Sequence, residues 1–590
     1  MKSYFDAEMR LLNEAAIEFA KSYPEQASML NLTEVRDRDP YIERLLEGMA
    51  YLTAHIRSRI DDDVPEISQT LINQMWPQFI RPFPSATVIE FSTKINLLAK
   101  PEYCQKGIRV LSGLVGEEAN KERKTKGEKL KCEYRTTSGV VLNPLKIVQA
   151  EIREDIATGF AIRVDFEIGA GATLDQLDLN NLPVYLHGYP ILTLDLWYYL
   201  THELNEVRLR IPTTQGDDVR SLGGQSCVLP AHMDLESTIL PKSGRSFVGT
   251  HLLHEYFCFR EKFLFINLLG LGHVVWPKDC KKFSLEFQLD GQLPGDYRVD
   301  EQTFRLHCTP AVNLFRTKSE PVAIDHRRSE YRVVPDVNKP NSLFIYSIDK
   351  VESVGRASGQ RNAYHSIHEL KNRSDSPRHY HISNRNRAQG GEEAFISIGG
   401  ISHYEEETLS CDVHAYNGHF PRRYLFEGSI RDNAKNNNEL KEALELTNIT
   451  RPTPTYIPPG DVDYQWGVVA HLALNYSSIA DLETLKRILY LYEWTGRKEN
   501  LRKIDGIKDV DLDLYQEMYR GALVSGMEIS LTLHEGNYAS ISDIALFGRI
   551  LHSFFTMYAN INTLVRTRVH CHPSGKEFSW QPALGETSLM

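Results

Sequence analysis

Residues 40–60 read PYIERLLEGMAYLTAHIRSRI, and this stretch decides the first part of the fold. Asp39 suits an N-cap and Pro40 suits the first helical position, so we expect a helix to begin here. Apolar side chains then recur every three or four residues, which is the spacing of one helix face. The members of this face are Ile42, Leu45, Met49, Leu52, Ile56 and Ile60. The pattern predicts an amphipathic helix of about five turns.

The flanking sequence predicts further helix. Residues 4–22 carry a similar stripe, and the Tyr23-Pro24 step should end that helix because proline disfavours α geometry in the residue before it. This stripe consists of Phe5, Met9, Leu12, Ala16 and Phe19. Downstream, Asp61-Asp62-Asp63 followed by Pro65 predicts a break and a new helical segment, which ends at the proline-rich residues 76–84. We therefore expect residues 1–84 to form a helical region.

A unit of this size can bury only part of such stripes by itself. Two interpretations stay open at this point. The stripes pack within their own domain, or a partner protein supplies the rest of a helical bundle.

The hydrophobic period changes after residue 84. Residues 161–168 alternate apolar and charged side chains, which predicts a half-buried strand, and residues 283–289 alternate in the same way. Residues 343–348 form a nearly continuous apolar run, which suits a strand buried on both faces. We expect two β-rich domains, over residues 85–240 and 241–452.

Two polar stretches interrupt the β-rich region. The basic run 121–129 is typical of a solvated hairpin tip, and it lacks the aromatic side chains that would stack on bases. Residues 354–393 predict a long exposed loop that becomes ordered only against a partner.

Helix returns after residue 452. Asp481 is an N-cap candidate for a helix carrying Leu482, Leu485, Ile488 and Leu489, and residues 527–533 alternate as a strand. A last helical stripe consists of Leu546, Ile550, Phe554, Met557 and Ile561. Residues 453–590 should thus form an α+β domain, and the whole chain an α+β multidomain protein.

Composition excludes several classes of protein. Apolar residues make up 42% and charged residues 25% of the 590, as in an average soluble protein. The net charge of −11 gives no positive field for nucleic acid or anionic lipid. Asp6 and Glu8 interrupt any apolar core of an export signal, and no apolar run is long enough to span a bilayer. Eight cysteines are too few for a disulfide scaffold, so we expect a cytoplasmic protein with reduced thiols.

Sequence motifs for catalysis, cofactor binding or metal binding are weak in this chain. His570-Cys571-His572 and the Cys411, His414 and His419 set lack the convergent spacing of a zinc site. The histidines of the polar stretch, which are His365, His368, His379 and His381, are typical surface residues. No nucleophile elbow, Walker loop or dinucleotide fingerprint is present. We therefore predict no catalytic, cofactor or metal residues. The alternative function is a cytosolic metal-dependent hydrolase. Trp197-Tyr198-Tyr199 could form a platform for glycan binding, but we favour core packing for these three residues.

Three regions together resemble one family. The first runs from Tyr4-Phe5 through Asp39-Pro40-Tyr41-Ile42-Glu43-Arg44-Leu45-Leu46-Glu47-Gly48-Met49-Ala50-Tyr51-Leu52 to Pro82-Phe83-Pro84. The second holds Leu252-Leu253-His254-Glu255-Tyr256-Phe257 and Pro310-Ala311-Val312-Asn313-Leu314-Phe315. The third holds His471-Leu472-Ala473-Leu474-Asn475-Tyr476 and Phe554-Phe555-Thr556-Met557-Tyr558. In this order, over essentially the whole chain, they resemble the TssF (ImpG, VasA) family of type VI secretion baseplate subunits.

The resemblance implies a structural, non-enzymatic protein. Members of this family are expected to form baseplate wedges with TssG and a second TssF copy, and these wedges join TssK and TssE around a hub of the spike protein VgrG. The baseplate then docks on the membrane complex and primes assembly of the contractile tail, as in contractile phages. It implies a cytoplasmic location at the inner-membrane apparatus, with no nucleic acid and no direct membrane insertion. Our hypothesis is that Ile42, Leu45, Met49, Leu52 and Ile56 form the partner interface.

Overall fold

The computed structural model describes most of the chain. The described residues are 2–23, 40–93, 98, 100–116, 129–155, 159–169, 171–213, 216–241, 249–277, 280–295, 297–356, 358–367, 378–386, 392–400, 406–433, 444–472, 479, 481–519, 521–561 and 563–585. Residues 121–128 of the basic run 121–129 lie outside them, as do Asp39 and His368. The chain divides into two compact units, one of residues 1–80 and 459–473, the other of residues 81–458 and 474–590.

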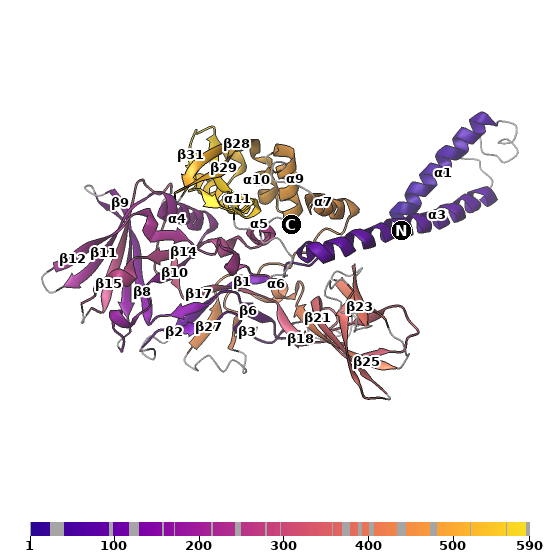
Figure 1. The fold of residues 1–590 in the computed structure, drawn as a ribbon, viewed down its shortest axis with the longest axis horizontal. Coiled ribbons are helices and arrows are strands. Elements are labelled where there is room, and N and C mark those ends of the chain that lie inside the picture. The colour runs from indigo at the N-terminus through magenta and orange to yellow at the C-terminus, as the bar shows by residue number, and fades with distance from the viewer. Residues whose placement is uncertain are drawn as a thin grey trace. The chain divides into compact units, whose positions relative to one another are not determined.

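The first unit is helical, as predicted. It contains α1 (Lys2–Ser22), α3 (Pro40–Met75), the 3₁₀ turn η1 (Pro77–Phe79) and α7 (Val462–Leu472). Helix α1 packs beside α3 as a hairpin (Figure 1). The predicted break at residues 61–65 is wrong, because α3 continues through Pro65. A proline inside a helix removes a single backbone donor, and a helix of 36 residues keeps the rest.

Aromatic packing closes the base of the first unit. Trp76 stacks on Phe79 with ring centroids 5.5 Å apart, and both rings meet the edge of His471 from α7. The Tyr464 hydroxyl donates to the Phe79 carbonyl oxygen over 3.1 Å. These contacts tie α7 to the end of α3, although about 380 residues separate them in sequence.

The second unit is built on several sheets (Figure 1). One has the order β26-β3-β6-β17-β1-β27, with bounds Ile430–Asn433, Arg109–Ser112, Glu133–Thr136, Cys308–Val312, Ala86–Thr93 and Leu444–Asn448. Another has the order β12-β11-β15-β9-β8, with bounds Gly216–Gly223, Leu204–Thr213, Lys282–Leu289, Gly159–Ile168 and Leu145–Asp155. A third has the order β13-β14-β10-β16, with bounds Val228–Pro230, Phe265–Leu269, Asn181–Leu186 and Phe304–Leu306.

A further sheet follows the order β18-β25-β21-β22-β23-β24-β20, with β19 also on β25. The bounds in that order are Phe315–Lys318, Glu407–Tyr416, Phe344–Gly355, Arg361–Ser366, His379–Asn386, Glu392–Gly399 and Tyr331–Val333, with β19 at Val322–Ile324. Two small ribbons pair β2 (Glu102–Cys104) with β7 (Val140–Leu142) and β4 (Val115–Gly116) with β5 (Lys129–Leu130).

Strands from both predicted middle domains pair with each other. Strand β1 lies between β17 and β27, and β15 lies between β9 and β11. The division of the chain at residues 84, 240 and 452 stays a prediction, but the α+β fold class with a β-rich middle is confirmed.

Two details of the β-rich region correct the sequence interpretation. Strand β15 is buried on both faces, whereas its alternation predicted a half-buried strand. Its polar face is covered by three arginine side chains that form ion pairs with Glu286. The nearest is Arg210, whose Nε lies 2.6 Å from the carboxylate. Strand β9 alternates as predicted.

The polar stretch 354–393 is not one long loop. It contains β22, β23 and the start of β24, with residues 368–377 and 387–391 outside the described part. Tyr364, Tyr380 and Ile396 lie in the core below these strands, while their other face is polar. The composition is loop-like because a strand with one exposed face needs few apolar residues.

The C-terminal part is α+β, as predicted. Its sheet has the order β28-β29-β30-β31, with bounds Ile507–Tyr519, Ala522–His534, Leu564–His572 and Glu577–Ser579, and β32 (Ala583–Leu584) also pairs with β30. Helices α9 (Leu482–Tyr492), α10 (Lys498–Asp505) and α11 (Ile541–Tyr558) accompany it, and α11 connects the parallel strands β29 and β30. The Asp481 N-cap is confirmed, since its side chain accepts from the Thr484 backbone N–H.

The described part of the second unit also contains α4 (Pro190–His202), α5 (Gly249–Cys258) and α6 (Phe420–Tyr424). Trp197 and Tyr198 of α4 are buried, as favoured over a glycan platform. Helix α11 packs against α4 and α5 and is buried nearly all round. Ile561, predicted in its stripe, lies beyond the end of the helix and is exposed.

Several buried histidines make folding sensitive to acid. Burial lowers the pKa of His202, His307 and His471 to about 4 and that of His232 and His552 to about 3. These rings are neutral in the fold, whereas the unfolded chain binds protons below about pH 6.5. Stability should therefore be fully present above pH 6.5 and fall progressively as the pH drops toward the folded pKa values.

We expect His307→Asn to flatten this pH dependence, because one depressed pKa disappears. Asparagine also tolerates the left-handed backbone at this position, where φ is 57°. Calorimetric melts of both proteins between about pH 7 and pH 4 measure the effect. An equal slope in the two proteins would contradict it.

Candidate functional site

The predicted partner face lies open on α3. Leu45 is 65% exposed, Met49 49% and Leu52 62%, whereas the side chains of Ile42 and Ile56 lie outside the described set. The five positions are spaced by three, four, three and four residues, which is the a/d repeat of a coiled-coil seam. We call these five residues the α3 stripe. Its described members are not covered within the described part of the chain.

Helix α1 uses a different face of α3. Ala50 and Ala54 are fully buried, and Leu46 and Thr53 are half-buried, so these residues mark the side of α3 that packs within the hairpin. At about 100° per residue this side lies roughly a quarter turn from the α3 stripe. Small alanine side chains let α1 approach closely, and the larger apolar side chains are left outside.

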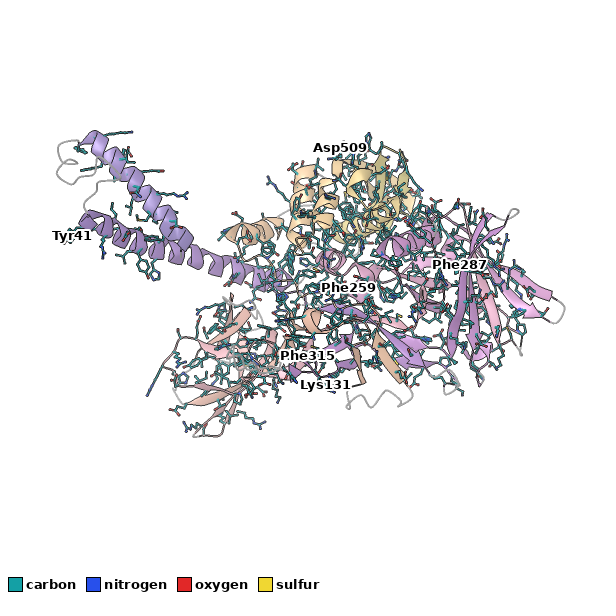
Figure 2. The ribbon with its side chains drawn as sticks, turned by 180° about the vertical axis from the view of Figure 1, so that it is seen from behind. Tyr41, Lys131, Phe259, Phe287, Phe315 and Asp509 are labelled. Carbon is teal, nitrogen blue, oxygen red and sulfur yellow. The ribbon has the colours of Figure 1, made fainter. Side chains whose placement is uncertain are left out.

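The exposed apolar surface extends beyond the α3 stripe. Tyr41 is 85% exposed and stands at the start of α3 (Figure 2). On α1, the predicted stripe residues Phe5, Met9, Leu12 and Ala16 are half-buried, but Phe19 is 40% exposed. Burying one large apolar side chain is worth about 1.5–3 kcal/mol, so covering three of them outweighs the ordering of a few side chains. Contiguous apolar surface of this kind marks protein interfaces.

The C-terminal metal candidates do not converge. His570 and His572 lie on β30 with Cys571 between them, and strand neighbours point to opposite faces. His570 Nδ1 lies 3.0 Å from a Glu577 carboxylate oxygen. Burial raises the pKa of the Cys571 thiol to about 11, which disfavours the thiolate that zinc needs.

The other candidates are also separated. Cys411 is buried on β25, and burial raises its thiol pKa to about 11, while His414 pairs with Asp349 over 2.7 Å. His419 stands at the N-cap position of α6 without a side-chain capping bond, and His365 and His379 are register partners on β22 and β23 beside His381. Among the described residues, no three His, Cys, Asp or Glu side chains form a metal-binding group.

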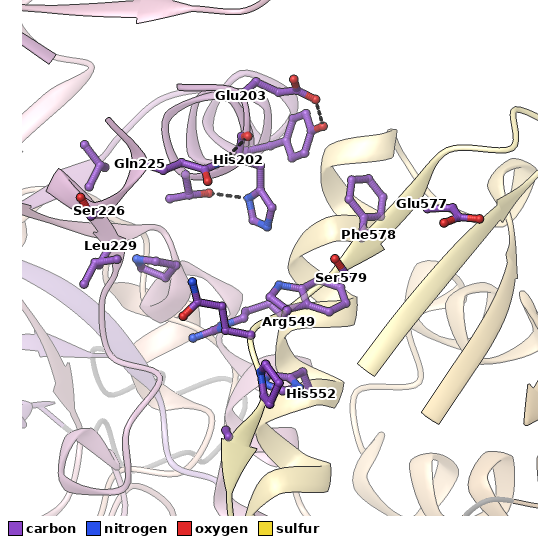
Figure 3. Close-up of a pocket in the computed structure, with 18 of the residues that line it drawn as sticks. His202, Glu203, Gln225, Ser226, Leu229, Arg549, His552, Glu577, Phe578 and Ser579 are labelled. Carbon is purple, nitrogen blue, oxygen red and sulfur yellow. Dashed lines mark hydrogen bonds between the residues drawn. The ribbon is translucent and has the colours of Figure 1, made fainter. Parts of the chain in front are cut away.

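The second unit contains a cavity of about 740 Å³ that no sequence pattern predicted (Figure 3). Its walls come from the end of α4, the 3₁₀ turn η3 (Gln225–Cys227) with β13, helix α11, and the segment around β31. We call it the α4–α11 pocket. Figure 3 shows Arg549 among these walls, with His552 on the same helix.

Most charged groups of the α4–α11 pocket are paired. The Glu203 carboxylate accepts from the Tyr198 hydroxyl and from Lys576 Nζ, the latter over 2.8 Å. Burial alone would raise the Glu203 pKa, but these two donors outweigh it and hold the pKa below its ordinary value. Burial lowers the pKa of His202 to about 4 and of His552 to about 3, and Arg549 adds to both effects. Both imidazoles are therefore neutral at pH 7.

The comparisons place the chain in a family. The family model described as "Type VI secretion system, TssF" matches residues 1–587. The chain belongs to the TssF family. A curated relative is the type VI secretion system component TssF1 of Pseudomonas aeruginosa, which is 26% identical over 99% of this chain and 98% of its own length.

Two solved structures hold similar chains. One is the TssK-TssF-TssG baseplate subcomplex, with 30% identity and a TM-score of 0.78 over 93% of this chain and 99% of that one. The other is a type VI baseplate complex, with 28% identity and a TM-score of 0.63 over 98% of both chains. TssF is thus a structural subunit of the type VI secretion baseplate. Within the described ranges of this TssF-family chain, none of the helices combines the length and the hydropathy that a membrane-spanning segment requires.

Because the described residues of the α3 stripe are exposed, we expect the isolated chain to tolerate polar substitutions there. Leu45→Asp with Leu52→Asp should change the free energy of unfolding by no more than about 0.5 kcal/mol per site, because both side chains already face water. The matched control is Ala50→Asp with Ala54→Asp, which puts the same charges on the buried side and should unfold the hairpin. Circular dichroism melts measure both variants. Unfolding of the Leu45/Leu52 variant would make these residues core.

Proposed function

We propose that this chain is a wedge subunit that assembles through the α3 stripe with TssG and a second TssF copy. The observation that supports this is an a/d repeat of large apolar side chains on a helix whose other face already packs against α1. A seam with this spacing is satisfied by one or two further helices that pack nearly parallel to α3.

The proposed partners differ in their support. TssG and TssK are named with TssF in the solved baseplate subcomplex. The second TssF copy, TssE, the VgrG hub and the membrane-complex proteins rest on the family resemblance. The acidic net charge of −11 suits protein partners better than nucleic acid.

The proposed location is the cytoplasm, at the apparatus docked on the inner membrane. This agrees with eight buried cysteines, none of which forms a disulfide, as fits a reducing compartment.

The proposed mode of action involves no catalysis. The chain would act by presenting apolar and shaped surfaces to neighbouring subunits. A metal-dependent hydrolase with ligands from His570, Cys571 and His572 or from Cys411 and His414 is the competing class.

Leu45→Asp with Leu52→Asp should abolish co-purification with TssG, because two carboxylates would have to be desolvated in the seam. The yield of complex is measured by size-exclusion chromatography of the co-expressed proteins, together with the mass of the complex. The matched control is Arg44→Asp with His55→Asp, which adds negative charge on an exposed side of α3 away from the stripe. A wild-type yield of complex from the Leu45/Leu52 variant would contradict the proposal.

Elemental analysis tests the competing class. We expect purified protein to contain far less than one zinc per chain, because the candidate ligands do not share a site. Stoichiometric zinc that is lost in His570→Ala would instead support the hydrolase.

A further inference from the structure

We propose that the α4–α11 pocket binds a carboxylate of a peptide segment from a partner protein, with Arg549 as its counter-ion. The pocket belongs to the second compact unit, so the proposal is independent of the α3 stripe. It adds a second docking point that recognises a charge instead of an apolar seam.

The first argument is the balance of charge in the pocket. Glu203 is taken by Lys576 and Tyr198. Glu577 lies beside His570, and Figure 3 shows it pointing away from Arg549. Among the described residues no carboxylate lies within ion-pairing distance of Arg549, and its Nε is buried without an acceptor. The guanidinium is the one cation of this lining that the described residues leave unpaired.

The second argument is the cost of that arrangement. Arg549 is only partly exposed, and burial lowers its pKa, so its charge is maintained at the expense of stability. A planar guanidinium matches a carboxylate through two parallel hydrogen bonds. An incoming carboxylate would satisfy Arg549, whereas a neutral or cationic group would not.

The third argument is the shape and lining of the pocket. Its volume is within the usual range of about 300–1,000 Å³ for ligand sites. Phe578 and Trp580 form an aromatic wall, and the Trp580 indole Nε1 also lacks an acceptor among the described residues. Gly548 permits this wall, because an added Cβ would lie 2.4 Å from the Trp580 ring. The preferred ligand is therefore a carboxylate attached to an apolar group.

A peptide carboxylate fits better than a phosphate. The two histidines are neutral at pH 7, and Lys576 is already paired, so one positive charge is available. One guanidinium balances one carboxylate but not the roughly two negative charges of a phosphate.

The test uses the full chain and N-acetylphenylalanine, a mimic of a peptide carboxylate beside an apolar side chain. Isothermal titration should show it binding about tenfold or more tightly than N-acetylphenylalaninamide, as expected for a charge-assisted hydrogen bond. Arg549→Gln should remove this preference, and Arg549→Lys should reduce it. The matched control is Arg568→Gln on β30, which loses the same charge but whose guanidinium pairs with Glu528 over 2.9 Å outside the pocket.

Three outcomes would overturn the proposal. Equal binding of acid and amide would show that the charge is not recognised. Full binding by Arg549→Gln would place the ligand elsewhere. Displacement of the probe by an equal concentration of inorganic phosphate would assign the pocket to small anions.

The folding control is the melting temperature of Arg549→Gln. A value at or above that of the unchanged protein shows that any loss of binding is not a loss of fold.

Discussion

Burial of the α3 stripe is the interaction on which the proposed assembly role of this chain depends. Leu45, Met49 and Leu52 face water in the isolated chain, while Ala50 and Ala54 hold the hairpin together. The small residues let the two helices of the hairpin pack closely, and in our proposal the large ones pack against another helix. A helix with two apolar faces of different size can therefore serve the fold and the assembly at once.

Several charges are buried as ion pairs within the second unit, as in Lys503 with Asp543 over 2.6 Å and Lys262 with Glu255. Against this background the unpaired Arg549 is an exception, because buried charges normally have partners. The two surfaces differ in physical character, one apolar and one electrostatic. A subunit that docks through both would gain affinity from the first and orientation from the second.

The sequence predicted those helices and strands whose own side-chain spacing determines them. Helix α1, the capped start of α9 and strand β9 follow from the spacing of their own side chains. The predicted break at Pro65 was wrong because the loss of one backbone donor does not end a helix of 36 residues, and residues 354–393 resembled a loop because one face of those strands is polar. The α3 stripe was found from sequence because it lies on one helix. The α4–α11 pocket was not, because its walls come from segments up to about 380 residues apart.

Thiol footprinting of α3 tests the central claim most directly. All eight native cysteines are buried, so Leu52→Cys would supply a single accessible thiol, and Glu47→Cys on another side of the helix is its matched control. Both should react with a maleimide in the free chain. In the complex with TssG, the account predicts that Cys at position 52 is protected while Cys at position 47 still reacts. Equal labelling of position 52 in the free and the assembled protein would contradict it.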